Sequence, residues 1–341
     1  MQKIDLTDLS PIIPKKIKKL EASYITRYVI TAELIKRIIS GKKYEPLKIL
    51  DIGGYNGALV DLLPEAQITV VDIQEDSNLK NYLKVTESKL PFKDNTFDFV
   101  ISCDTLEHVK PGERDIFINE VIRVASEYII IAAPFKSEAS ESEEAISNAF
   151  YQGMTGFGYT WLEEHRDYIL PSKQWLERLI RKHKGIYYKS IDHTSIGLWG
   201  NMLRNSFFLP GNIGEVNSHI ASSLVAFNDI YVNNFAFKDF PKEGYRTFYV
   251  ISKINDIDIV LPKYDIKKHT EMTAEYMRLL GSSIQELTKQ YGVMSKEIIE
   301  LKVAKEEKEK IALELAGIKS HIIYRIYRKI RNLWNFNMNS M

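Results

Sequence analysis

The chain of 341 residues contains one cysteine, Cys103, so no intrachain disulfide can form. This fits a reducing compartment, and the first residues lack the apolar core of a signal peptide, so we expect a cytoplasmic protein. The longest apolar run, from Tyr128 to Phe135, is far shorter than the roughly 20 residues that a membrane-spanning helix needs. The net charge is only +1, which gives no overall reason to expect a nucleic-acid partner.

Three glycines fall together in the turn Gly53-Gly54-Tyr55-Asn56-Gly57. The apolar segment 48–51 precedes this turn and 58–63 follows it, which indicates a strand, a turn and a helix. Such a turn lets a ligand approach the backbone at the carboxyl end of a strand in a doubly wound sheet, although a plain turn would look the same. No Lys followed by Ser or Thr comes after Gly57, which excludes a P-loop.

A second strand, 68–72, ends on Asp72, which lies 21 residues after Asp51. An acidic side chain at this distance can accept both hydroxyls of a ribose, or it can simply cap the following turn. A dinucleotide site requires Gly-x-Gly-x-x-Gly, whereas the spacing here is Gly-Gly-x-x-Gly with Tyr55 at a common glycine position. A nucleotide-sugar or NAD-dependent enzyme is therefore disfavoured.

Further downstream, the strand 97–103 runs directly into Asp104-Thr105-Leu106-Glu107-His108-Val109. Together with the Asp51 turn and Asp72, this series resembles the class I S-adenosylmethionine-dependent methyltransferases, in the small-molecule branch that includes ubiquinone-type enzymes. The resemblance covers residues 45–135 and extends more loosely to 254. It implies a Rossmann-like methyltransferase domain with a seven-stranded sheet, which we place at 45–260.

The resemblance also implies a binding site for S-adenosylmethionine. Asp51, Gly53 and Gly57 would line its methionine part. Asp72 would hold the ribose hydroxyls, and Ile73 would pack on the adenine. Glu87 and Leu90 would lie at the polar edge of the adenine. Cys103 and Asp104 would lie beside the sulfonium.

Two positions depart from the family pattern. Tyr55 replaces the usual middle glycine, so the loop is tighter or places a ring over the methionine, and we include Tyr55 among the cofactor contacts. Thr86 stands where the family commonly has an Asp for the adenine amine, so Glu87 or a backbone carbonyl would serve instead. These departures keep a second hypothesis open, in which the domain is a non-catalytic scaffold or binding module.

The predicted strands of the sheet are 48–52, 68–72, 82–86, 97–103, 128–134, 186–191 and 245–252, the last two forming an antiparallel edge. Ahead of the sheet we expect a helical segment, 1–44, with a tether at 1–13 and helical spacing of apolar residues from 15 to 40. Helices are also predicted at 114–124 and at 174–182, where Ser172 is placed to cap the second one.

Two inserts interrupt the domain, at 136–171 and 192–244. The first begins with an acidic, polar stretch that we expect to be mobile, and continues with aromatic residues that form either a lid over a substrate or a small satellite core. The second is long for a loop, so we expect helices near 221–228 that complete an acceptor pocket or a dimer contact.

His108 and His165 are the candidate general bases. Methyl transfer needs mainly positioning, but a hydroxyl acceptor also needs a base to remove its proton. His108 could instead only pack against the cofactor loop, and His165 could belong to a surface ion-pair cluster at 163–167. The sequence predicts no metal site.

The character of the chain changes after residue 266. Apolar residues occupy the a and d positions of one heptad frame over 277–315, with Lys305 and Lys308 as the exceptions, which predicts a coiled coil at 267–318. A helix from 270 to 318 would be about 70 Å long and would pair with itself or with a partner helix, unless it folds back on the domain.

The tail, 319–341, is basic and amphipathic, with five Lys or Arg residues and no acidic residue after Glu314. Such a helix lies readily on an anionic membrane surface at the inner face, or it docks on a partner or stays solvated. The sequence therefore predicts an S-adenosylmethionine-dependent methyltransferase that methylates an oxygen of a small-molecule, sugar or lipid-linked glycan acceptor.

Overall fold

The computed structural model describes the chain except for residues 56, 75–78, 87–88, 208–228 and 339–341. It contains two compact units, Met1–Leu279 and Leu280–Met341. The helices predicted near 221–228 lie outside the described residues.

The first unit is built around a mixed sheet of seven strands with helices, as expected for a Rossmann-like methyltransferase fold. Its spatial order is β4-β3-β2-β5-β6-β8-β7, and β8 runs antiparallel to both of its neighbours whereas the other pairs are parallel. The third strand was predicted at 82–86, but in the structure it ends at Lys84, two residues earlier. The strands are β2 (Lys48–Ile52), β3 (Gln67–Asp72), β4 (Tyr82–Lys84), β5 (Phe97–Cys103), β6 (Ala125–Pro134), β7 (Tyr187–Ser195) and β8 (Gly244–Ser252).

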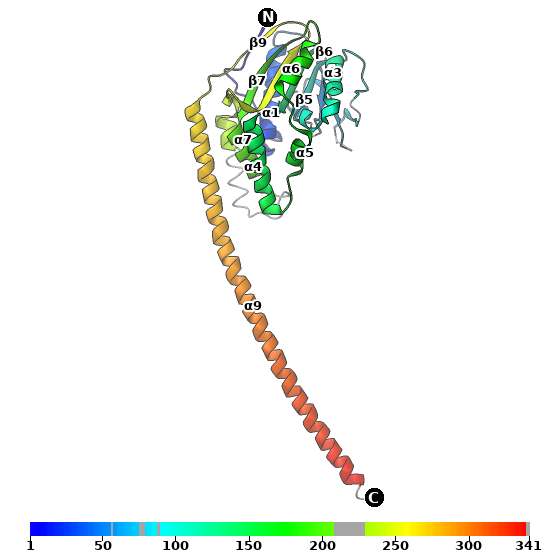
Figure 1. The fold of residues 1–341 in the computed structure, drawn as a ribbon, viewed down its shortest axis with the longest axis vertical. Coiled ribbons are helices and arrows are strands. Elements are labelled where there is room, and N and C mark those ends of the chain that lie inside the picture. The colour runs from blue at the N-terminus through cyan, green and yellow to red at the C-terminus, as the bar shows by residue number, and fades with distance from the viewer. Residues whose placement is uncertain (56, 75–78, 87–88, 208–228, 339–341) are drawn as a thin grey trace. The chain divides into compact units, whose positions relative to one another are not determined.

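Helices cover both faces of this sheet (Figure 1). On one face, Val121 of α3 and Leu179 of α6 pack with Ile131 of β6 in the main core. On the other face lies α1, whose Thr31 hydroxyl contacts Cys103. Because successive strand residues alternate between two buried faces, β6 is apolar over its fully buried part, from Tyr128 to Pro134. The helices are α1 (Ala22–Ile39), α2 (Ala58–Leu62), α3 (Arg114–Val124), α4 (Glu138–Thr155), α5 (Thr160–Tyr168), α6 (Lys173–Arg181) and α7 (Ile196–Ser206), with short 3-10 turns η1 (Ile17–Lys19), η2 (Leu106–His108), η3 (Pro111–Glu113) and η4 (Ala236–Lys238).

The first residues form a strand, so the prediction of a tether at 1–13 was wrong. β1 (Gln2–Asp5) pairs in parallel with β9 (Ile257–Val260), which follows the last strand of the main sheet. Ile4 and Leu6 are fully buried. A strand of four residues shows too little alternation to be recognised locally, and its partner lies at the far end of the unit.

The acidic start of the first insert is helical, so the prediction of a mobile stretch was also wrong. The hydroxyl of Ser137 accepts the Ser140 N–H at 3.1 Å and caps α4. Ser140, Glu144 and Ser147 form one buried face of α4, which packs against α7. These small and polar residues hold the helix on the domain although they carry no apolar pattern. The predicted Ser172 cap of α6 is confirmed by a 3.1 Å hydrogen bond from the Trp175 N–H.

Part of the aromatic insert forms a satellite core, one of the two alternatives that the sequence left open. Tyr151 and Tyr159 pack on Phe207, and the ring of Trp199 stacks on Tyr245 with centroids 3.4 Å apart. The insert therefore contributes packing to the domain as well as side chains to the site described below.

A single long helix, α9 (Ile266–Met338), begins in the first unit. Met272 and Tyr276 are buried there, so the compact unit extends beyond the boundary predicted near residue 260. Within the second unit, described apolar side chains such as Leu301 and Leu315 are exposed. Among the described residues, none of the helices combines the length and apolar character that a membrane span requires.

Candidate functional site

The candidate site lies where the sheet reverses its strand order. β2 and β5 are neighbours, and the sheet continues from β2 to β3 and β4 on one side and from β5 to β6 on the other. The carboxyl ends of strands at such a switch point are the usual place of a ligand. Asp51, Asp72 and Asp104 all lie at these ends, as the sequence predicted.

The glycine turn after β2 is closely packed. Gly53 has a φ of +79°, and a Cβ there would lie 2.2 Å from the hydroxyl of Thr105. A Cβ on Gly54 would lie 2.1 Å from a carboxylate oxygen of Asp51. Gly57 also has a positive φ, at the start of α2. A side chain at Gly53 or Gly54 would therefore have to displace Thr105 or Asp51, and the positive φ of Gly53 favours glycine as well.

Asp51 is fully buried, and neither of its carboxylate oxygens has a hydrogen-bond partner among the described residues. Burial raises its pKa to about 7, and the charge of Arg27 opposes this rise. A buried carboxyl group of this kind normally has a partner, so Asp51 is suited to receive a cationic group of a ligand.

Asp72, the last residue of β3, is held by two backbone N–H groups. Its carboxylate accepts the Tyr55 N–H at 3.3 Å and the Gln74 N–H at 3.0 Å. The next residue, Ile73, is 70% exposed and available for contact. The ring of Tyr55 meets the edge of Tyr82 in β4, with centroids 6.2 Å apart, so Tyr55 lies on the Asp72 side of the turn.

The remaining predicted contacts differ in their surroundings. Leu90 is buried in the main core and its N–H donates to Glu120 at 2.9 Å, so only its backbone edge could face a ligand. Glu87 lies outside the described residues. Cys103 is buried beside Thr31, with 3.3 Å between the sulfur and the hydroxyl oxygen, and burial raises the pKa of its thiol to about 12.

Asp104 follows β5 and forms ion pairs with two arginines. Arg246 of β8 and Arg27 of α1 both contact its carboxylate, and the Arg246 Nε lies 2.6 Å from Oδ1. Burial would raise the pKa of Asp104, but the two guanidinium groups outweigh this and lower it. Arg27 also lies over the Tyr24 ring, at 4.4 Å from its centroid. The sequence did not reveal Arg246 as part of this group.

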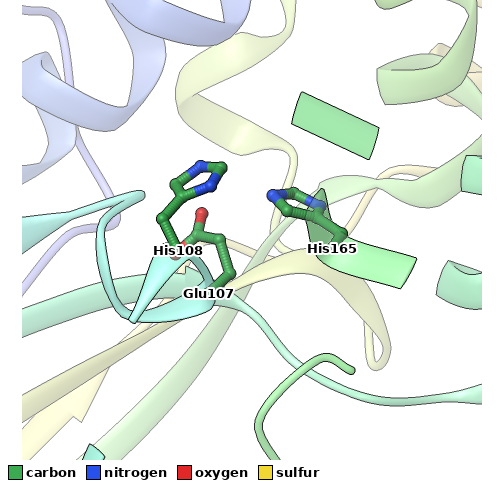
Figure 2. A group of neighbouring side chains, drawn as sticks. All are labelled: Glu107, His108 and His165. Atoms are coloured by element: carbon green, nitrogen blue, oxygen red, sulfur yellow. The ribbon is translucent and has the colours of Figure 1, made fainter. Parts of the chain in front are cut away.

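The structure brings His108 and His165 together, with ring centroids 4.8 Å apart (Figure 2). His108 Nδ1 lies 2.9 Å from a carboxylate oxygen of Glu164, and His165 Nδ1 lies 3.0 Å from one of Glu144. Figure 2 shows the carboxyl group of Glu107 beside the two rings. These two glutamates and Glu107 are functional candidates that the sequence did not reveal.

His165 is only 6% exposed, so it does not belong to the surface ion-pair cluster that was the alternative. That cluster exists without it, because Arg166 pairs with Glu163 and Asp167. Glu164 and His165 are adjacent in α5, and Trp161, one turn earlier, packs edge-on against His108. A spacing of three and four residues places these side chains on one helix face, which is a signal that the sequence did contain.

The charges in this cluster interact strongly. Burial raises the pKa of Glu107 to about 8, and the charge of Asp104 adds to the rise. Burial and the charge of His165 lower the pKa of His108. Burial also acts to lower the pKa of His165, but its hydrogen bond to Glu144 and the surrounding carboxylates outweigh burial and raise it.

Residues 50–128 match a family model described as a methyltransferase domain. The match runs from β2 into β6, agrees with the Rossmann-like methyltransferase sheet of the first unit and supports S-adenosylmethionine as the cofactor.

A curated relative is an uncharacterised protein of Methanocaldococcus jannaschii, 32% identical over 119 residues that cover 32% of this chain and 51% of that protein. The chain thus spans about half the length of the relative that it matches. Similar solved structures include the plantazolicin methyltransferase with SAH and a pentazolic desmethylPZN analogue (14% identity, 67% of this chain, 86% of that chain, TM-score 0.40). Another is phosphoethanolamine N-methyltransferase 2 of Haemonchus contortus with S-adenosyl-L-methionine (16% identity, 65% of this chain, 51% of that chain, TM-score 0.39). Identities and TM-scores this low carry no information about the substrate of this chain.

Proposed function

We propose that the unit Met1–Leu279 is an S-adenosylmethionine-dependent O-methyltransferase acting on a hydroxyl of a small molecule, a sugar or a lipid-linked glycan. The observation that carries the proposal is the fully buried carboxyl group of Asp51 beside the glycine turn, which has no hydrogen-bond partner among the described residues. Leaving a buried polar group unpaired costs about 1–3 kcal/mol, and more when it is charged. The ammonium group of the cofactor's methionine part would be its partner.

The other predicted contacts fit the same ligand. Asp72 would accept the ribose hydroxyls, and the exposed Ile73 would pack on the adenine. Cys103 and Asp104 would lie beside the sulfonium. Because Arg27 and Arg246 both pair with Asp104, the three side chains together have a net charge of +1, and this carboxylate adds no net negative charge there.

When bound, S-adenosylmethionine supplies a methyl group that forms a bond to the acceptor oxygen while its bond to sulfur breaks and the sulfur keeps the electron pair. The acceptor hydroxyl also loses its proton, which a nearby base accepts. We assign this role to His108 or His165. A carboxylate holds Nδ1 of each ring, so Nε2 is the nitrogen left to accept a proton.

The direct test is calorimetric titration of the purified full chain with S-adenosylmethionine and, separately, with NAD. We expect micromolar binding of S-adenosylmethionine and no binding of NAD. If neither ligand binds, the proposed function fails, and a non-catalytic module that works through its helical extension becomes the better hypothesis.

The raised pKa of Asp51 predicts that cofactor affinity depends on pH. Near pH 6 the carboxyl group is mostly protonated in the free protein, and pairing with an ammonium group requires it to lose that proton. Affinity should therefore rise about fivefold from pH 6 to pH 7, with proton release detectable by calorimetry in buffers of different ionisation enthalpy. The prediction covers pH 6 to pH 7 only, because the α-amino group of the cofactor's methionine part would lose its own proton near pH 8.

The variant Asp51→Asn supplies the control for this pH dependence. It should bind the cofactor more weakly than the wild type, and with an affinity that does not change between pH 6 and pH 7. A wild-type affinity that is equally flat over this range would exclude Asp51 as the partner of the ammonium group.

For the second unit, we propose that the heptad positions of α9 pair with a second copy of the chain. The described members of this stripe are exposed in the single chain, among them Met294, Ile298 and Leu301. Exposed apolar residues at heptad spacing are the normal seam of a coiled coil.

A chain that stops after Leu279 should therefore fold but have a lower oligomeric state than the full chain, measured by light scattering. A chain that stops after Asp265 should lose stability as well, because it lacks Met272 and Tyr276, which are buried in the first unit. An unchanged oligomer number after the first truncation would refute the proposed pairing.

The same truncation tests the tail at 319–341, which we place against an anionic membrane surface on the basis of its basic and apolar residues. The full chain should sediment with vesicles that contain phosphatidylglycerol and not with pure phosphatidylcholine vesicles. The chain ending at Leu279 should sediment with neither. Absence of binding by the full chain would favour a protein partner for the tail.

A further inference from the structure

Three side chains converge on one point at the rim of the candidate site, although the sequence predicted no metal there. One ligand atom from each of Glu107, His108 and His165 lies within 4.8 Å of the other two. Figure 2 shows Glu107 and His108 side by side, with the His165 ring facing them from the other side. η2 supplies the first two residues and α5 supplies the third.

Two of the converging atoms are buried and have no hydrogen-bond partner in the part of the chain that the structure describes. Glu107 is 1% exposed and His165 is 6% exposed. Within the described part of the chain, neither Glu107 Oε2 nor His165 Nε2 has a hydrogen-bond partner. No lysine or arginine among the described residues forms an ion pair with the Glu107 carboxylate. A shared ligand would satisfy both atoms together.

The surroundings of the two histidines favour a metal ion as that ligand. Each Nδ1 is held by a glutamate, His108 by Glu164 and His165 by Glu144. Glu144 is held in turn by the hydroxyl of Tyr245 at 2.7 Å. Metal-binding histidines usually donate their second N–H to a carboxylate in this way, which fixes the ring and directs the other nitrogen at the ion.

We infer that Glu107, His108 and His165 bind one divalent transition-metal ion. Two imidazole nitrogens and one carboxylate oxygen suit Mn²⁺, Fe²⁺, Co²⁺ or Zn²⁺, whereas Mg²⁺ prefers an all-oxygen set. Bonds of about 2.1 Å place neighbouring ligand atoms about 3–3.5 Å apart, so the side chains need to move inward by about 1 Å.

Three protein ligands leave coordination positions free for a substrate. The side chain of His108 is 25% exposed, so the ion would be reachable from solvent. If the proposed function holds, the acceptor oxygen would bind at one of these positions. A hydroxyl on a divalent cation is a stronger acid, and its proton can leave to water. The two imidazoles would then act as ligands, in place of the base role given to them above.

The test is a titration of the chelator-treated full chain with Co²⁺, followed by calorimetry and by visible absorption. The wild type should bind one Co²⁺ per chain, and Mg²⁺ should not compete. Glu107→Gln and His165→Gln should each weaken Co²⁺ binding at least about 100-fold, because each removes a ligand, and Glu164→Gln should weaken it about 10–100-fold. His183→Gln is the matched control, because His183 is a histidine away from the site that contacts Asn119.

Binding of S-adenosylmethionine by each variant shows whether it is folded and separates the two proposals. Cofactor binding without Co²⁺ binding by the wild type overturns the metal site and leaves the proposed function in place. Co²⁺ binding that Glu107→Gln, His165→Gln and Glu164→Gln all leave unchanged also overturns it. Site-dependent Co²⁺ binding without cofactor binding supports the metal site and contradicts the proposed function.

Discussion

Replacing Asp104 with alanine is expected to lower the free energy of unfolding by about 3–5 kcal/mol, because removal of one partner leaves buried charges uncompensated. Arg246 is 1% exposed and Arg27 is largely buried, and both guanidinium groups contact this one carboxylate. The substitution would leave two like charges close together, with no other acidic side chain among the described residues paired to either of them. Urea denaturation of the purified chain measures the change.

The matched control for this experiment is Asp94→Ala. Asp94 pairs with Arg123 at 2.8 Å, but its side chain is 71% exposed. An exposed ion pair contributes about 0–1 kcal/mol, so the control should change stability by no more than that. Equal effects of the two substitutions would show that burial of the Asp104 group does not determine its contribution.

Replacing Asp72 with alanine is expected to weaken S-adenosylmethionine binding at least about 100-fold. The carboxylate would accept two ribose hydroxyls, and hydrogen bonds to a charged group contribute about 1.5–3 kcal/mol each. The loss therefore corresponds to several kcal/mol of binding free energy, where about 1.4 kcal/mol is a factor of ten. Calorimetric titration at pH 7 measures it.

Asp98→Ala is the comparison for Asp72→Ala. Asp98 also lies in a strand of the sheet, where its carboxylate accepts the Lys48 N–H at 2.8 Å, but it is near the amino end of β5. Its replacement should leave the affinity unchanged. If Asp72→Ala binds as tightly as the wild type, the ribose assignment is wrong.

The central part of the fold could be predicted because its signals are local. The strands from 48 to 52 and from 97 to 103 match β2 and β5, since short apolar runs bounded by turn residues identify buried parallel strands. The positions of Asp51, Asp72 and Asp104 follow from these strands, because the carboxyl ends of neighbouring parallel strands meet at one edge.

What could not be predicted depends on contacts between distant parts of the chain. Arg246 meets Asp104 across 142 positions, and β1 meets β9 across almost the whole unit. Glu144 contacts His165 from α4, and the polar, acidic sequence of that segment did not indicate a helix packed on the domain. A pattern of seven or eight residues contains no information about such partners, so the local sequence could name His165 but not its environment.

The position of β8 has a consequence for synthesis of the protein. β8 is the last strand of the seven to be translated, yet it lies between β6 and β7. Until Ser252 has left the ribosome, β6 presents an apolar, unpaired edge, and such edges invite pairing with other chains. The nascent chain can close its sheet only when almost all of the first unit has emerged, so translation from Pro134 to Ser252 is the interval in which chaperone protection matters most.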